Sequence, residues 1–531
     1  MAAGRSLPRY MEKKLTDTAK PNRGKAYLVG AGPGDPGLIT VRGLEILKKA
    51  EVVIYDYLAG EKLLKYVPED AEFIYAGKKG GVKHTHTQEE INEMLIDRVR
   101  SGKRVVRLKG GDPFIFGRGG EELEELVKAG LSFEAVPGVT SASAAATFAG
   151  VPITHRRYTS SVAFITGHED PDKESSNIAW DKISTGVGTL VFYMGIKNLE
   201  SITANLMKHG RDPKTPVAVV RWASRPNQKS VVGTLDTIAE IVRTNDIKPP
   251  ALTIVGEVVK LRDTINWYEQ RPLFGKRIVV TRTREQASDL VALLEENGAN
   301  CLEFATISIH PPDSWDELDN SLQRLGDFQW VVFTSINAIH AFFGRLYAKG
   351  MDTRALATCK IAAVGKVTDD CLRAYGLISD LLPEKFTAEG LAQAFEKMDV
   401  GGQAILIPRA LKAREVLPAR LGKAGARVTI VPVYQNKRPE GMHETLRAKL
   451  ANKDVDIVTF TSSSTVTNFI EMIGVKGPRE LQELMSGIKI AAIGPVTGRT
   501  IEENGLKVDI QPQTYTIPDL VDAIAKDARS S

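Results

Sequence analysis

The chain has 531 residues, of which 43% are hydrophobic and 25% are charged, and its formal net charge is +5. This composition is ordinary for a soluble globular protein of several domains, and it excludes a collagen-like, coiled-coil or wholly disordered chain. No apolar run approaches the roughly 18 residues of a membrane-spanning helix, so no membrane partner is expected. Three cysteines without a Cys-x-x-Cys pair exclude a disulfide scaffold and a thiolate zinc site, and they fit a reducing cytoplasm.

The first 24 residues form a basic segment. They contain six Lys or Arg residues but only Glu12 and Asp17 as acids, so they carry +4 of the net charge of +5. The apolar stretch of a secretory signal is absent from them. We therefore predict a flexible extension on a cytoplasmic protein, and no nucleic-acid partner, because the remaining residues are almost neutral overall.

From Lys25 onward, short apolar segments alternate with glycine-rich turns, and an amphipathic helix is expected over residues 40–50. This alternation is typical of α/β layers. A break in the pattern at residues 267–275 predicts a linker between a first domain, residues 25–266, and a second domain, residues 276–531. The strands expected in the first domain lie at residues 26–29, 51–55, 105–108, 161–166, 189–193, 216–220 and 252–255.

The turn after the first strand suggests a dinucleotide site. Gly30-x-Gly32 follows the strand, and Asp56 lies near the position of a ribose-binding acid. However, the third glycine of that fingerprint is replaced by Asp35, and Pro33 stiffens the turn. We therefore disfavour NAD binding.

The loop at residues 107–122 is a more specific signal. The paired Gly110 and Gly111 follow a strand and allow a ligand to approach the backbone closely, and Asp112 can accept hydrogen bonds from it. The alternative is a tight turn followed by a capped helix from Glu121, which explains the glycines but not Arg118 and the aromatic residues around it.

The second domain contains an internal repeat. The matching segments imply two copies of one α/β unit, and we expect two similar lobes with a ligand-binding cleft between them. The alternative is that the lobes only stack. The matches are residues 277–282 with 404–409 and 333–335 with 460–462, both at an offset of 127, and residues 361–365 with 490–494 at an offset of 129.

The first domain resembles uroporphyrinogen-III C-methyltransferase, a member of the tetrapyrrole methylase class. The resemblance covers about residues 25–265 and implies two α/β subdomains with S-adenosylmethionine (SAM) in the cleft between them, usually in a homodimer. This is not a Rossmann-type methyltransferase fold. The motifs that carry the resemblance are residues 29–35, Lys78 with 88–92, 107–122, 137–142 and 192–195.

The resemblance also implies residue roles. Asp56 would accept a proton, Lys78 would donate one, and Arg118 would bind substrate carboxylates bidentately. From the residues alone, we would favour a helix cap or a loop salt bridge for Asp56 and a surface lysine for Lys78. His84 and His86 lack a third ligand at diagnostic spacing, so no metal is expected. The residues expected around SAM are Pro33, Gly110, Gly111, Asp112, Ile115, Thr140, Ser141, Met194 and Ala223, the last in place of the glycine usual in the family.

A further ordered set of motifs lies at residues 333–338, 363–368, 433–434, 460–463 and 493–497. On these motifs the second domain resembles uroporphyrinogen-III synthase over residues 273–527. The resemblance implies that one lobe is discontinuous, with residues 276–308 plus 435–527 in one lobe and 309–434 in the other. It also implies ring closure of hydroxymethylbilane with inversion of the last pyrrole, without metal or redox chemistry. Tyr434 is the candidate for assisting loss of the hydroxyl group, with a core tyrosine as the alternative. The candidate substrate-binding residues are Thr334, Ser335, Thr368, Thr461, Ser462 and Thr497, of which Ser462 and Thr497 could instead be N-caps.

The two resemblances fall on consecutive reactions, because the product of the synthase is the substrate of the methyltransferase. We therefore expect a bifunctional enzyme that uses SAM and tetrapyrrole substrates, and a homodimer formed through the methyltransferase half. The alternative is a SAM methylase for another substrate, fused to a non-catalytic bilobal tetrapyrrole-binding module.

Overall fold

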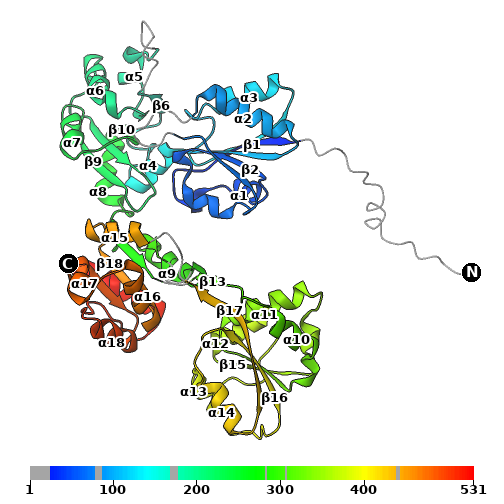
Figure 1. Cartoon of the computed structure of the whole chain (residues 1–531). Helices are drawn as coiled ribbons and strands as arrows, with labels where there is room; N and C mark the ends of the chain where they lie inside the picture. Colours follow the sequence, from blue (N-terminus) through cyan, green and yellow to red (C-terminus); the bar gives the residue numbers. More distant parts are fainter. Residues whose placement is uncertain are drawn as a thin grey trace, which may run out of the picture. The chain divides into compact units, whose positions relative to one another are not determined.

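The computed structural model describes residues 24–77, 86–167, 177–281, 284–304, 308–437 and 443–530. The predicted extension up to residue 23, Lys78 and His84 lie outside the described residues. The chain divides into two compact units, residues 1–276 with 295–300, and residues 277–294 with 301–531 (Figure 1). Within the described ranges, no helix combines the length and apolarity needed to cross a membrane.

The first unit begins with a parallel sheet of order β3-β2-β4-β1-β5. Its central strands are apolar on both faces, as expected where helices cover both sides. Helix α1 packs on one face, and α2 and α3 pack on the other. The bounds are β1 Lys25–Gly30, α1 Val41–Leu47, β2 Val52–Tyr55, β3 Glu72–Tyr75, α2 Gln88–Arg100, β4 Arg104–Lys109, α3 Gly119–Lys128 and β5 Ser132–Val136.

Helix α4, Ser141–Ala149, leads into a second, mixed sheet of order β6-β7-β10-β8-β9. Only β6 and β7 are parallel among the described pairs. Helix α4 packs on one face of this sheet, and α6 and α7 pack on the other. The bounds are β6 Val162–Thr166, α5 Trp180–Gly186, β7 Thr189–Tyr193, α6 Leu199–Lys208, β8 Pro216–Arg221, β9 Lys229–Thr234, α7 Ile238–Thr244, β10 Ala251–Val255 and α8 Arg262–Ile265.

All seven strands predicted in this unit are confirmed, and so is the helix predicted at residues 40–50. Three further strands, β3, β5 and β9, were not predicted from the sequence, and they lie at sheet edges. Their side chains are mostly exposed or half-buried, so these segments lack the apolar run that reveals a central strand.

The segment expected as a linker packs on the first unit. Tyr268 and Leu273 are buried. The Tyr268 ring meets the Phe148 ring of α4 edge to face, with the centroids 4.8 Å apart. Aromatic burial therefore anchors residues 267–274 to the core beneath α4.

The second unit contains two sheets. One has the order β12-β11-β18-β19 and the other the order β13-β17-β16-β14-β15. The strands are β11 Arg277–Val280, β12 Asn300–Glu303, β13 Ser308–His310, β14 Trp330–Phe333, β15 Lys360–Ala363, β16 Ala404–Ala410, β17 Arg427–Lys437, β18 Ile457–Phe460 and β19 Lys489–Ala492. The helices are α9 Arg284–Glu296, α10 Asp316–Gln323, α11 Ile336–Ala348, α12 Lys366–Ala374, α13 Ala388–Glu396, α14 Val416–Lys423, α15 His443–Ala451, α16 Ser463–Ile473, α17 Pro478–Met485, α18 Pro495–Glu503 and α19 Ile517–Ser530.

The repeat is visible in the strand order. The order β11-β18-β19 in one sheet corresponds to β16-β14-β15 in the other. A matching detail lies 129 residues apart: the Asp380 carboxylate accepts a hydrogen bond from Ile361 N, and the Asp509 carboxylate accepts one from Ile490 N. Each sheet combines the first half of one sequence copy with the second half of the other, so the sequence copies are not the lobes.

Candidate functional site

A pocket in the first unit opens where strands β1, β4, β7 and β8 end and helix α4 begins. Its cavity volume is about 190 Å³. All nine residues predicted to surround SAM line it, although they come from segments spread over 190 residues of sequence, from Pro33 to Ala223. Asp56, which a dinucleotide site would need near the ligand, does not line this pocket.

Backbone-to-backbone packing shapes the glycine loops of the pocket. Gly111 N donates a hydrogen bond to Gly32 O at 2.8 Å, which joins the β1 and β4 loops. A Cβ on Gly138 would lie 2.2 Å from Gly111 O, so no larger residue fits there. The Asp112 carboxylate closes the same loops, because Oδ2 accepts a hydrogen bond from Gly138 N at 3.0 Å and Oδ1 accepts one from Phe114 N at 2.8 Å.

The pocket also concentrates unusual backbone conformations. Phe116, Met194 and Trp222 line it with φ values of 52°, 55° and 53°, in the left-handed region that non-glycine residues rarely adopt. Such strain persists only where the surrounding structure enforces it, and it clusters at functional sites. The conformation directs these large side chains to the pocket.

Tyr193 is a pocket residue that the sequence analysis did not single out. Its hydroxyl group lies 2.7 Å from Thr140 Oγ1 and accepts a hydrogen bond from Ala142 N at 3.3 Å. Burial raises the pKa of Tyr193, so the phenol is neutral near pH 7. The available signal was its position next to Met194 at the end of an apolar strand.

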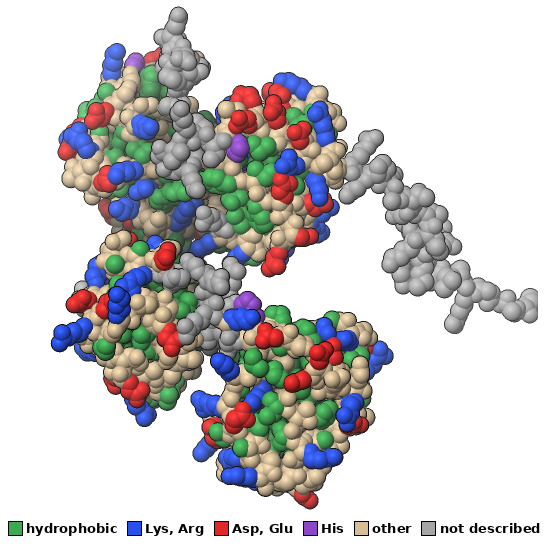
Figure 2. Space-filling model, in the orientation of Figure 1, with side chains coloured by type: hydrophobic (Ala, Val, Ile, Leu, Met, Phe, Trp, Pro, Cys, Tyr) green, Lys and Arg blue, Asp and Glu red, His purple; other side chains and the backbone are tan. Residues whose placement is uncertain are grey.

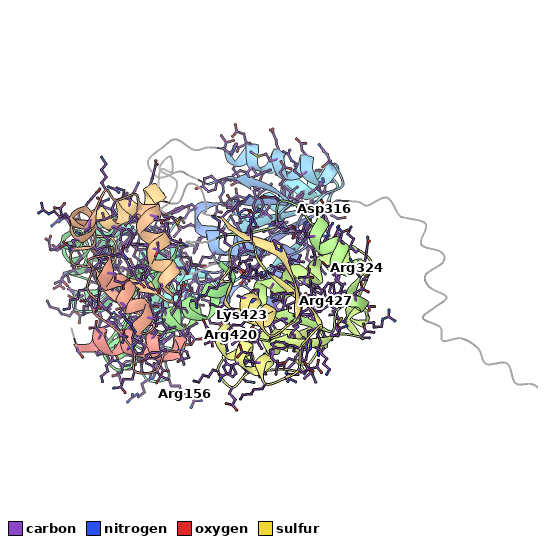
Figure 3. All side chains as sticks on the ribbon, turned by 60° about the horizontal axis from the view of Figure 1, so that its bottom comes forward. Arg156, Asp316, Arg324, Arg420, Lys423 and Arg427 are labelled. Carbon is purple, nitrogen blue, oxygen red and sulfur yellow. The ribbon has the colours of Figure 1, made fainter. Side chains whose placement is uncertain are left out.

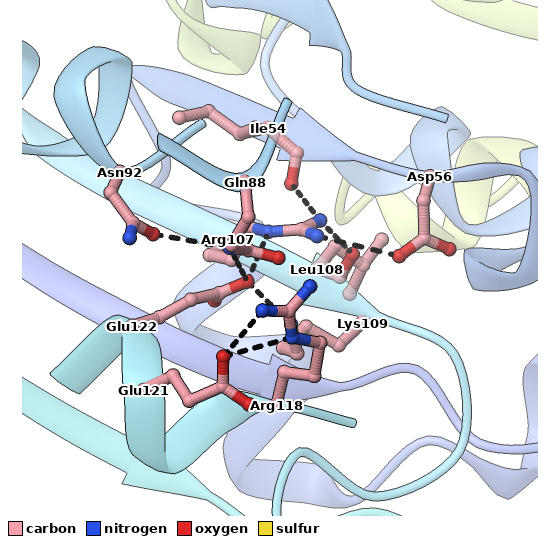
Figure 4. Close-up of polar contacts among 10 residues, drawn as sticks. All are labelled: Ile54, Asp56, Gln88, Asn92, Arg107, Leu108, Lys109, Arg118, Glu121 and Glu122. Carbon is pink, nitrogen blue, oxygen red and sulfur yellow. Dashed lines mark hydrogen bonds and ion pairs between the residues drawn. The ribbon is translucent and has the colours of Figure 1, made fainter. Parts of the chain in front are cut away.

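Behind the pocket lies a cluster of buried charges (Figure 4). Lys109 Nζ lies 2.6 Å from Glu122 Oε1, and Arg107 Nε lies 3.4 Å from the same oxygen. On its other side Arg107 approaches Asp56, with Nη2 at 3.5 Å from Oδ2. Burial lowers the pKa of Lys109, with a further contribution from the charge of Arg107.

Asp56 combines the two roles considered for it from the sequence. Its Oδ1 accepts a hydrogen bond from Leu58 N at 3.0 Å and caps the short turn after β2, while the pair with Arg107 is the loop salt bridge. Arg118 is exposed, with its guanidinium on the Glu121 carboxylate at 2.6 Å (Figure 4). Because Glu121 is also exposed, the Arg118 guanidinium can leave it and bind a ligand that arrives from solvent.

In the second unit the predicted donors gather at corresponding positions of the two sheets. Ser335 caps α11 by accepting a hydrogen bond from Ala338 N at 3.1 Å, and Ser462 caps α16 by accepting one from Thr465 N at 3.3 Å. Thr334 and Thr461 precede these caps. In the same way, Thr368 and Thr497 lie buried in the first turns of α12 and α18. The N-cap alternative is thus correct for Ser462, whereas Thr497 lies inside its helix.

Tyr434 lies on β17 and is 9% exposed. Its hydroxyl group is 3.3 Å from Ser335 Oγ, which links it to one of the predicted donors. Most of its ring packs in the apolar core, which agrees with the alternative that Tyr434 is a core tyrosine. Tyr434 also lines a cavity of about 480 Å³ together with Trp315, Asn337 and His340.

Comparisons with known proteins agree with both halves. A family model described as tetrapyrrole (corrin/porphyrin) methylases matches residues 25–239, and one described as uroporphyrinogen-III synthase HemD matches residues 288–522. The porphyrin biosynthesis protein HemD of Ruminiclostridium josui is 39% identical over 447 residues, which are 84% of this chain and 88% of that protein. The chain belongs to both families.

Two further relatives cover the methylase domain alone. The S-adenosyl-L-methionine-dependent uroporphyrinogen III methyltransferase of Methanosarcina barkeri (strain Fusaro / DSM 804) is 51% identical over 250 residues, 47% of this chain and 97% of that protein. The uroporphyrinogen-III C-methyltransferase of Priestia megaterium is 52% identical over 236 residues, 44% of this chain and 98% of that protein. The family resemblance predicted for each half is therefore confirmed.

In the synthase domain, Arg409 is a second residue that the sequence analysis did not single out. It is 8% exposed and lies at the carboxyl end of β16, between β17, which carries Tyr434, and β14, which Thr334 follows. Its two Nη atoms meet Arg414 O and the exposed Glu415, whereas Nε has no hydrogen-bond partner among the described residues. The signal was available, because residues 404–409 form one of the repeated segments.

Other basic residues of the synthase domain differ from Arg409. Arg324 and Arg420, which are labelled in Figure 3, form ion pairs with Asp327 and Glu396 and are exposed and half-buried, respectively. Arg427 lies at the amino end of β17, so it is far along the strands from the predicted donors. Arg409 thus differs from these three arginines, because it is buried and lies at the carboxyl ends of the strands.

The histidines predicted not to form a metal site can be followed only in part. His86 lies 3.4 Å from Glu90 at the start of α2 of the methylase domain. No group of three His, Cys, Asp or Glu side chains suited to a metal ion occurs in the part of the chain that the structure describes.

Proposed function

We propose that the chain catalyses two consecutive steps of tetrapyrrole synthesis. The synthase domain closes hydroxymethylbilane to uroporphyrinogen III, and the methylase domain then methylates uroporphyrinogen III twice to precorrin-2. The observation that carries the proposal is the convergence of nine predicted residues on one pocket of the methylase domain.

The pocket fits SAM in its chemistry. The described residues that line it include one carboxylate, Asp112, and hydroxyl groups from Thr140, Ser141 and Tyr193, but no Lys or Arg. A cationic sulfonium with a neutral adenine and a ribose suits such a lining, whereas a pyrophosphate favours the cationic side chains that this lining lacks. When bound, SAM supplies an electrophilic methyl group.

The chain's own residues would align and deprotonate the substrate. Exposed apolar side chains gather on the first subdomain (Figure 2), and those of Tyr57, Leu58 and Phe114 offer a surface for a flat macrocycle next to the pocket. The macrocycle carbon would take the methyl group of bound SAM as the S–CH3 bond breaks, and Asp56 would take the proton that the macrocycle loses. Arg118 would hold a substrate carboxylate, and Lys78 would return a proton.

The synthase domain would hold a flexible polycarboxylate in a folded pose. The donors at the ends of β14, β15, β18 and β19 suit carboxylates, as does the buried cation of Arg409. Tyr434 would assist departure of the terminal hydroxyl group, with Ser335 fixing its orientation. Tyr434 would donate a proton to the terminal hydroxyl oxygen, the C–O bond would break with its electron pair on that oxygen, and water would leave.

The deciding experiment incubates the purified chain with hydroxymethylbilane, with and without SAM, and separates the products by HPLC and mass spectrometry. Isomer III without SAM and a dimethylated product with SAM are expected. If only isomer I forms while added isomer III is still methylated, the synthase domain is a non-catalytic binding module. If the chain methylates a different substrate but not uroporphyrinogen III, the methylase domain is a SAM methylase for that other substrate. Light scattering of the full chain tests whether it forms a homodimer.

A further inference from the structure

The charge cluster behind the pocket contains a carboxylate that no proposed step uses. Glu122 is 0% exposed, and Arg107 and Lys109 are 4% and 5% exposed. A single oxygen, Glu122 Oε1, receives Lys109 Nζ at 2.6 Å, Gln88 Nε2 at 3.3 Å and Arg107 Nε at 3.4 Å (Figure 4). The other oxygen, Oε2, has no hydrogen-bond partner among the described residues.

Folding alone does not explain this arrangement. Removing three charges from water is costly, and well-packed apolar residues of similar size are usually at least as stabilising. Along one face of β4 the side chains change from apolar to charged. Val105 packs into the apolar core, and the next two residues on that face, Arg107 and Lys109, are cationic. The change occurs at the strand's carboxyl end, where the next residues, Gly110 and Gly111, line the pocket.

The contacts form a chain that ends at Asp56. Glu122 holds the Nε side of the Arg107 guanidinium, and Nη2 on the other side lies 3.5 Å from Asp56 Oδ2. Nη1 donates to the carbonyl oxygens of Ile54 and Leu108, which fixes the plane of the guanidinium. Asp56 is the end that solvent reaches, because its side chain is 26% exposed. The two cations and two carboxylates balance in charge.

We propose that Glu122 is a positioning residue for methyl transfer: it anchors Arg107, and Arg107 orients the carboxylate of Asp56 toward the macrocycle. The inference rests on the proposed function, because it takes Asp56 as the proton acceptor. Lys109 is the second cation on the Glu122 carboxylate, with Nζ at 2.6 Å from the same oxygen that Arg107 approaches. Gln88 of α2 limits rotation of the Glu122 carboxylate through a hydrogen bond.

The test is a double-mutant cycle of D56N and E122Q in the full chain, with kcat for methyl transfer to uroporphyrinogen III measured at saturating SAM. We expect at least a tenfold loss of kcat in E122Q, with the Kd for SAM changed less than threefold. If Glu122 acts through Asp56, adding E122Q to D56N causes less than a twofold further loss. Losses that multiply, or an E122Q variant with full kcat, would overturn the inference. The control is E125Q on the same helix, whose exposed partner Lys128 also lies at 2.6 Å.

A second variant guards against a simple folding defect. The K109M/E122Q variant removes both charges of the Lys109–Glu122 pair, so neither is left buried without its partner. We therefore expect the Tm to recover toward that of the unaltered chain. We expect kcat to stay at least tenfold low, because Arg107 still lacks its anchor. Recovery of kcat together with Tm would show that Glu122 is only structural. Failure of the proposed function is distinguishable, because in that case the unaltered chain itself does not methylate uroporphyrinogen III. Full methyl transfer in D56N alone would instead show that Asp56 is not the proton acceptor.

Discussion

The hydroxyl groups of Thr140 and Tyr193 lie 2.7 Å apart and join the start of helix α4 to the end of strand β7. Both residues line the pocket, so this one hydrogen bond connects its two walls. The same tyrosine oxygen accepts from Ala142 N, a donor in the first turn of α4 that no intrahelical carbonyl can satisfy.

This contact yields a prediction for SAM affinity. Replacing Tyr193 by Phe keeps the ring and removes both hydrogen bonds, at a cost of about 1 kcal/mol. We expect the Kd for SAM, measured by calorimetry, to rise about fivefold. The exposed Tyr158, outside the pocket, is the matched control, and its change to Phe should leave the Kd unaltered. An unaltered Kd in Y193F would show that the hydrogen bond does not shape the pocket.

Gly138 should tolerate no side chain. In Gly138→Ala the new Cβ would lie 2.2 Å from Gly111 O and 2.8 Å from Gly30 Cα, both backbone atoms that cannot move independently. We expect the free energy of unfolding of the methylase domain to fall by about 1–3 kcal/mol or more, and we expect SAM binding to be lost. Calorimetry measures both changes.

The control for this substitution is Gly120→Ala. A Cβ at Gly120, in the first turn of α3, meets no atom within 4 Å. Alanine is the better helix former by about 1 kcal/mol, so this variant should be equally or more stable. Equal behaviour of the two variants would contradict the packing argument.

Arg409 should affect the synthase reaction and not the methyl transfer. Arg409→Met keeps much of the buried volume but removes the charge, and hydrogen bonds to charged groups contribute about 1.5–3 kcal/mol. We expect kcat/KM for hydroxymethylbilane to fall at least tenfold, with methylation of added uroporphyrinogen III unchanged. Arg427→Met, at the amino end of β17 in the same sheet, should retain synthase activity. Equal losses in both variants would indicate a general effect of charge.

Tyr268 should make the methylase domain sensitive to alkali. Burial raises the pKa of Tyr268 to about 12 from an ordinary value of 10.0. The folded state therefore disfavours the phenolate, so the stabilisation is fully present below pH 10 and is lost as the pH rises toward 12. We expect the Tm of the methylase domain to fall over this range in the unaltered chain. The fall should be smaller in Y268F, and an identical fall in both would assign the effect to other groups.

Local sequence patterns were sufficient for the central strands and for the pocket. A strand such as β7 is buried at every position and has hydrophobic residues after Thr189, and the residues around the pocket come from turns whose glycine and hydroxyl pattern is readable at short range. The edge strands β3, β5 and β9 lack that pattern because solvent covers part of their side chains. Tyr193 and Arg409 were missed because a buried polar group within an apolar strand resembles core until its partner is known.

The sequence by itself determined the α/β class, the two families and the presence of a repeat, because these depend on residue order within short segments. The family resemblance already implied a discontinuous lobe, but only the tertiary structure decided the strand register, in which β11 pairs with β18 and Ile278 lies beside Ile457. Likewise, only folding places Glu122 against Arg107 and Lys109. Strand pairing and burial of charge depend on which distant surfaces exclude water together, and no local pattern along the chain records that choice.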